Sequence, residues 1–89
     1  MSFRSLDLSL FKELFQKAKQ NPQGIRFKDL CRTCDYYFGT PRQKGSHRIY
    51  KTPWPGDPRV NIQNNNGFAK VYQVKQALKA IQKILEIET

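Results

Sequence analysis

The chain contains one histidine, His47, which follows a glycine and a serine within residues 44–50. An imidazole can accept or donate a proton near neutral pH, so it is a candidate general base or acid. Gly45 and Ser46 allow a tight backbone turn, which would hold the histidine at the start of a strand. The basic residues near it in the sequence are Lys44, Arg48 and Lys51. Cations around an imidazole favour an anionic substrate; the alternative is that His47 is an ordinary surface residue.

The charge of the chain is strongly positive and unevenly distributed. Its 16 Lys and Arg residues outnumber 7 Asp and Glu residues, which gives a net charge of +9. Residues 1–35 have seven basic and four acidic residues, whereas residues 36–85 have nine basic residues and one acid, Asp57. A segment with nine basic residues and one acid attracts a polyanion. Nucleic acid is therefore the first expected partner and an acidic protein the second. The alternative is a solvated face that only aids solubility.

Other classes of function have little support in the sequence. Cys31 and Cys34 form a single Cys-x-x-Cys pair, and zinc would need two more good ligands. Spaced three apart, they are predicted to be small apolar residues on one face of a helix. We therefore expect no metal and no other cofactor. No run of about 18 apolar residues and no signal-peptide core is present, so we expect a cytoplasmic protein without a membrane partner.

Two amphipathic helices are predicted before the histidine. Within residues 8–21, Leu10, Leu14 and Ala18 recur at the helical spacing, and a proline and a glycine follow. Residues 26–38 repeat apolar side chains at spacings of three and four, and a glycine follows them.

Three short strands and a long helix are predicted to follow. The predicted strands are residues 40–44, 48–52 and 59–63. Three prolines within residues 53–58 predict a rigid hairpin loop. Trp54 is expected to be tucked against the body of the protein; the alternative is an exposed ring that stacks on a ligand or enters a partner's pocket. Residues 64–67 are predicted to form a turn. The final helix is predicted over residues 69–87, where Lys70 would lie beside backbone N–H groups that favour an anion.

This order of elements predicts the fold class. Consecutive short strands indicate an antiparallel sheet, and helices covering one face leave the other face open to a ligand. We predict an α+β fold, with a three-stranded antiparallel sheet and helices on one face. The α-β-β-β-α order is that of double-stranded-RNA-binding domains, with an extra N-terminal helix. The whole chain, residues 1–89, is expected to form one domain, with the extra helix at 8–21 and the core at 26–87.

Three short motifs occur in order along the chain. They are Gly45-Ser46-His47, then Asn61-Ile62-Gln63, then Ala69-Lys70 with Tyr72-Gln73-Val74 and Gln76. Together they resemble the HicA-type toxins, small mRNA interferases of toxin–antitoxin pairs, and the resemblance covers about residues 26–84. The chain departs from the family in three places. Arg48 stands where many members have a second histidine, the first helix is present in only part of the family, and the Trp54 loop is not general.

The resemblance implies a type II toxin that is a metal-independent endoribonuclease, with His47 as its catalytic residue. Such toxins arrest growth by cleaving mRNA, and a HicB-type antitoxin inhibits them by covering the active face. RNA cleavage can use the substrate's own 2′-hydroxyl, which requires a base and cations for the charged phosphorane. The predicted RNA-binding residues are Lys44, Ser46, Arg48, Lys51, Lys70 and Tyr72. Tyr72, a lysine or water would protonate the leaving oxygen.

Two other functions remain open at this point. The chain could be a non-catalytic RNA-binding module of the same fold. It could also be an adaptor whose basic face binds an acidic protein. Loss of cleavage without loss of RNA affinity in His47→Ala would argue against the first.

Overall fold

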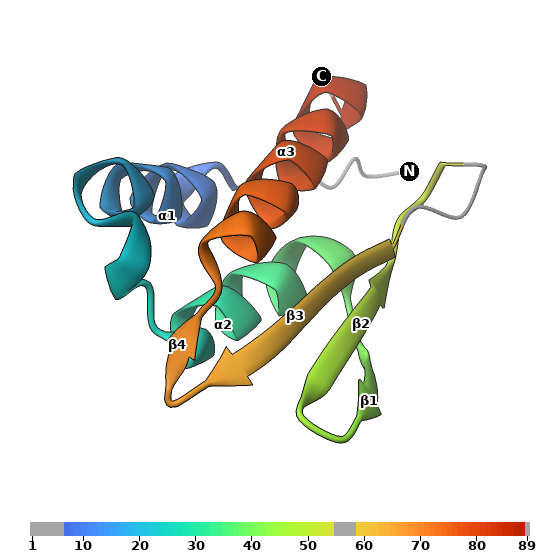
Figure 1. The fold of residues 1–89 in the computed structure, drawn as a ribbon. Coiled ribbons are helices and arrows are strands. Elements are labelled where there is room, and N and C mark those ends of the chain that lie inside the picture. Colours follow the sequence, from blue (N-terminus) through green and yellow to red (C-terminus); the bar gives the residue numbers. More distant parts are fainter. Residues whose placement is uncertain (1–6, 55–58, 89) are drawn as a thin grey trace.

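The structure is a computed structural model that describes residues 7–54 and 59–88. The described part contains three α-helices, one 3-10 helix and four strands (Figure 1). In chain order these are α1 (Ser9–Gln20), η1 (Pro22–Gly24), α2 (Phe27–Phe38), β1 (Arg42–Lys44), β2 (His47–Lys51), β3 (Arg59–Asn65), β4 (Phe68–Ala69) and α3 (Val71–Glu88). The predicted α+β class is confirmed.

The strands form one antiparallel sheet in the order β1-β2-β3-β4, with β1 at one edge and β4 at the other (Figure 1). Side chains alternate between the two faces of a strand, and cross-strand partners share a face. Tyr50, Val60 and Ile62 lie on the face that packs against α2 and α3, and each is at most 3% exposed. The opposite face contains His47 and its cross-strand partner Gln63. We call this second surface the open face.

The predicted number of strands is wrong by one. Phe68 and Ala69 were expected at or beside the start of the last helix, but they form β4 and pair with Asn65 and Asn64. The reason is the turn before them. Asn66 and Gly67 both have left-handed backbones, with φ of 54° and 87°, as the commonest two-residue hairpin turn requires. The chain therefore folds back as a hairpin, and α3 begins at Val71.

The other predicted elements agree with the structure to within one or two residues. The two N-terminal helices lie at Ser9–Gln20 and Phe27–Phe38. Most of the predicted proline loop, residues 55–58, lies outside the described residues. Trp54 is half-buried, and the Lys83 ammonium of α3 lies 4.4 Å from its ring centroid. The prediction that Trp54 is tucked against the body is confirmed.

The core lies between the sheet and the helices. Cys31 and Cys34 are 7% and 0% exposed and belong to the same apolar cluster as Leu14 and Val74. Their predicted role as small apolar residues is confirmed, and burial raises the pKa of both thiols. A thiol with a raised pKa is a poor nucleophile at neutral pH.

The hydroxyl of Tyr37 attaches the start of α1 to α2. It accepts a hydrogen bond from the backbone N–H of Phe11 at 3.1 Å and donates one to the carbonyl of Asp7.

Among the described residues, no helix combines the length and the apolar character that are needed to span a membrane.

Candidate active site on the open face

His47 is the first residue of β2 and follows a two-residue turn. Gly45, the first residue of that turn, has a φ of 61°. A type II′ hairpin turn needs a left-handed residue there, and glycine adopts this backbone without strain. Lys44 and His47 flank the turn and are cross-strand partners, so both side chains lie on the open face. This explains why a glycine and a serine precede the histidine.

A second strand holds the imidazole in place. Nδ1 of His47 lies 3.0 Å from Oδ1 of Asn61, which is on β3 next to the histidine's direct partner Gln63 on the open face. With the amide oxygen of Asn61 turned toward the ring, as here, Nδ1 is the donor, because an amide oxygen only accepts hydrogen bonds. In the neutral ring, Nε2 then has the free lone pair. Asn61 therefore favours the tautomer in which Nε2 can act as a base.

Gln73 connects the third sequence motif to the same place. Its side chain is 3% exposed, and its Oε1 accepts a hydrogen bond from the backbone N–H of Gln63 at 2.8 Å. Because β4 ends at Ala69, no strand residue meets this N–H, and the buried amide takes the place of a strand partner. Its Nε2 also lies 3.3 Å from the hydroxyl of Tyr72. The three motifs, far apart in the sequence, are thus joined by hydrogen bonds around His47.

Two of the predicted basic residues lie on the face of His47. Lys44 is its cross-strand neighbour on β1, and Lys51 lies four residues along β2. Both side chains are exposed. Arg42 and Arg59 share this face because their cross-strand partners are Ile49 and Lys51.

Arg48 does not lie beside the imidazole. As the next residue of the strand it points to the opposite face, where its Nη1 lies 3.6 Å from a carboxylate oxygen of Asp35 on α2. A hydrogen bond with Tyr50 raises the pKa of the guanidinium. The expectation that three cations surround His47 is therefore wrong for Arg48, because neighbouring residues of a strand point to opposite faces of the sheet.

The remaining predicted residues lie in the turn before β2 and at or beside the start of α3. Ser46 is exposed in the turn before His47, and its carbonyl accepts a long hydrogen bond of 3.4 Å from the N–H of Asn64. Lys70 lies between β4 and α3, next to the helix start as predicted. Tyr72 is 62% exposed in the first turn of α3. Through Gln73, its hydroxyl is linked to the strand position opposite His47.

Asn61, Gln63 and Gln73 belong to the sequence motifs, but none of the three was predicted to be a site residue. The signal for the first two was the alternation of polar side chains around Ile62, which is fully buried. For Gln73 the only signal was its place in the third motif, because an amide in the apolar stripe of a helix does not reveal which backbone group it meets.

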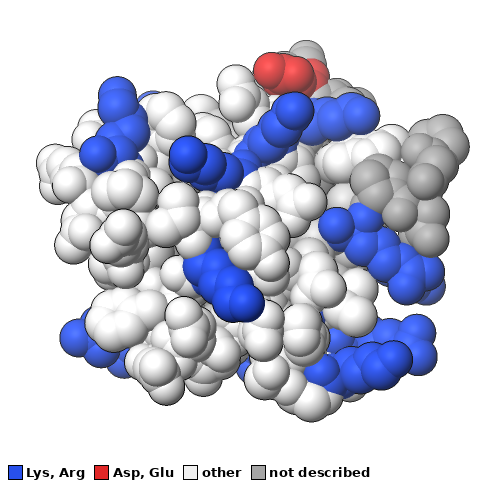
Figure 2. All heavy atoms as spheres, in the orientation of Figure 1, with Lys and Arg blue, Asp and Glu red and all other residues white. Residues whose placement is uncertain are grey.

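The electrostatics of the open face favour an anion. Four basic residues of the strands lie on this face, namely Arg42, Lys44, Lys51 and Arg59, and the four described strands contain no Asp or Glu. In Figure 2 basic side chains lie at several separate places across the visible surface, and acidic ones appear at one place near its upper edge. Within the described residues, no three His, Cys, Asp or Glu side chains lie close enough together to hold a metal ion.

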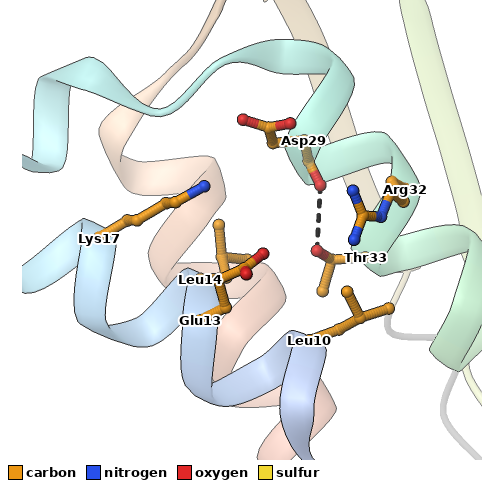
Figure 3. Close-up of a pocket in the computed structure, with 7 residues that line it drawn as sticks. All are labelled: Leu10, Glu13, Leu14, Lys17, Asp29, Arg32 and Thr33. Carbon is orange, nitrogen blue, oxygen red and sulfur yellow. Dashed lines mark hydrogen bonds between the residues drawn. The ribbon is translucent and has the colours of Figure 1, made fainter.

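A separate pocket lies between α1 and α2 (Figure 3). Its polar walls contain two carboxylates and two cations, namely those of Glu13, Asp29, Lys17 and Arg32. The hydroxyl of Thr33 in this pocket donates to the Asp29 carbonyl of its own helix at 3.0 Å. The pocket contains no residue of the three motifs, so the open face is the better candidate for the functional site.

Comparisons of the chain with protein-family models, with curated proteins and with solved structures find no match. The geometry around His47 and the three motifs are therefore the basis for a functional proposal.

Proposed function

We propose that the chain is a HicA-type toxin, a metal-independent endoribonuclease that cleaves mRNA with His47 as general base. One observation carries the proposal. The motifs on which the resemblance rests meet through two hydrogen bonds, His47 to Asn61 and Gln63 to Gln73. Residues that share a family motif for chemical reasons are expected to meet in this way.

The proposed reaction uses only groups of the RNA and the protein, together with water. Nε2 of His47 accepts the proton of a ribose 2′-hydroxyl, whose oxygen attacks the adjacent phosphorus. The bond from phosphorus to the 5′-oxygen then breaks, leaving a 2′,3′-cyclic phosphate and a 5′-hydroxyl. Lys44 is the nearest basic neighbour on β1 that would stabilise the charged phosphorane. The leaving oxygen takes its proton from Tyr72, a lysine or water.

The fold is compatible with this proposal. We propose that α2, the sheet and α3 correspond to the α-β-β-β-α order of double-stranded-RNA-binding domains, with β4 as a short added strand and α1 as an N-terminal addition. A HicB-type antitoxin would then inhibit the toxin by covering the open face. An acidic surface on that antitoxin would complement the basic residues of the strands.

Cleavage of a long transcript by purified protein in EDTA tests the proposal. We expect wild-type protein to produce fragments with 2′,3′-cyclic phosphate ends, and His47→Ala to produce none. The same RNA with 2′-O-methyl riboses should stay intact, because its 2′-oxygen has no proton to lose. If both proteins bind RNA and neither cleaves it, the chain is a binding module. If neither binds, an acidic protein partner is the better explanation.

A further inference from the structure

Two exposed aromatic rings line one groove at the β4 edge of the sheet. Phe68 is 41% exposed and Tyr72 is 62% exposed. The polar or basic side chains that line the groove with them include Asn65, Asn66 and Lys70. Because the two rings line the same groove, they form an exposed aromatic patch and not two isolated surface residues, and such a patch is a candidate binding surface.

The sheet register places Phe68 on the same face as His47. His47 pairs with Gln63, and Asn65, two residues further along β3, pairs with Phe68. Residues two apart on a strand share a face, as do cross-strand partners. Two strand spacings and two residue rises separate the two Cα atoms by about 12 Å. An extended strand of RNA that passes His47 would therefore reach Phe68 within a few nucleotides.

The charge around the groove complements RNA. The guanidinium of Arg26 lies 6.0 Å from the centroid of the Phe68 ring, and Lys70 is part of the groove wall. The described residues that line the groove include no Asp or Glu. Cations beside an aromatic ring are the usual arrangement for single-stranded nucleic acid, with phosphates on the cations and bases on the ring.

We propose that this groove is a base-binding subsite for single-stranded RNA, in which an unpaired base stacks on Phe68 and Tyr72 forms the facing wall. The inference rests on the proposed function and specifies its substrate as unpaired RNA. In a duplex each base face is covered by its neighbours, so a paired base has no free surface for Phe68. The side-chain amides of Asn65 and Asn66 would be available to hydrogen-bond the edge of the base.

Binding of a fluorescent 2′-O-methyl oligoadenylate to the full chain tests the subsite, because this RNA cannot be cleaved. We expect Phe68→Ala and Phe68→Leu to weaken binding at least about fivefold, the loss of one base–aromatic stack. Phe68→Tyr should retain wild-type affinity. The matched control is Phe15→Ala on α1. Phe15 is 44% exposed and has Lys19 above its ring, so it loses a similar surface away from the sheet.

The outcomes separate this inference from the proposed function. Equal affinity of Phe68→Ala and wild type, or an equal loss in Phe15→Ala, would overturn the subsite even if the enzyme cleaves RNA. A specific loss in Phe68→Ala would support it even if the wild type proves unable to cleave. An RNA duplex that competes as well as the single strand would also overturn it, as would no binding by the wild type. Circular dichroism of each variant checks that the fold is retained.

Discussion

The buried amide of Gln73 gives the most direct link between the sequence motifs and the stability of the fold. Its Oε1 accepts the backbone N–H of Gln63 at 2.8 Å, and the side chain is 3% exposed. Gln73→Leu keeps a similar side-chain volume but leaves this donor without a partner. A buried donor that loses its acceptor costs about 1–3 kcal/mol of folding free energy. The cavity contribution should be small, because leucine refills most of the space.

The loss of folding free energy in Gln73→Leu is measurable by chemical and thermal unfolding. For a domain of this size, each kcal/mol corresponds to about 4–8 °C in the melting temperature. The control is Gln76→Leu, one turn later on the same helix, where the side chain is exposed and the effect should stay within about 0.5 kcal/mol. If Gln73→Leu unfolds like the wild type, the amide does not replace a strand partner. Equal losses in the two variants would also refute the reasoning.

Three further predictions concern the open face. Asn61→Ala should lower the rate of RNA cleavage by less than loss of His47 does, because the base remains but its tautomer and orientation are no longer fixed; an unchanged rate in single-turnover assays would contradict this. Lys44→Ala should lower the salt dependence of single-stranded RNA binding by about 0.7 log units per log unit of salt, whereas Lys79→Ala on α3 should not; equal slopes would remove Lys44 from the interface. Gly45→Ala should cost about 1–2 kcal/mol of stability from its left-handed backbone, with Ser46→Ala as control; an unchanged urea midpoint would contradict it.

Helix positions and the presence of an antiparallel sheet followed from the sequence, because apolar spacing and proline or glycine boundaries act locally. β4 was missed although the Asn66-Gly67 pair is a strong hairpin signal. The last helix was predicted to begin at Ala69, two residues before the start of α3. Only two strand residues follow the turn, which is too few for an alternating pattern to show.

The candidate site was predictable only in part. The Gly-Ser-His segment identified His47 and its turn, because glycine has a distinct backbone preference. Arg48 follows His47 directly in the strand, and strand alternation alone places these two side chains on opposite faces. The contact of His47 with Asn61 depends on the register between β2 and β3. That register is fixed by which faces are buried and by the length of the connecting loop, and neither can be read from the motif itself.

The central claim is that His47 is the general base and has little structural role. Cleavage of a cellular mRNA by wild type and by His47→Ala, measured by primer extension beside a thermal melt of each protein, tests it most directly. We expect cleavage to fall about 10²–10⁴-fold. We expect stability to change by less than about 1 kcal/mol, because the side chain is partly exposed. A variant that stays folded and cleaves RNA at the wild-type rate would contradict the account.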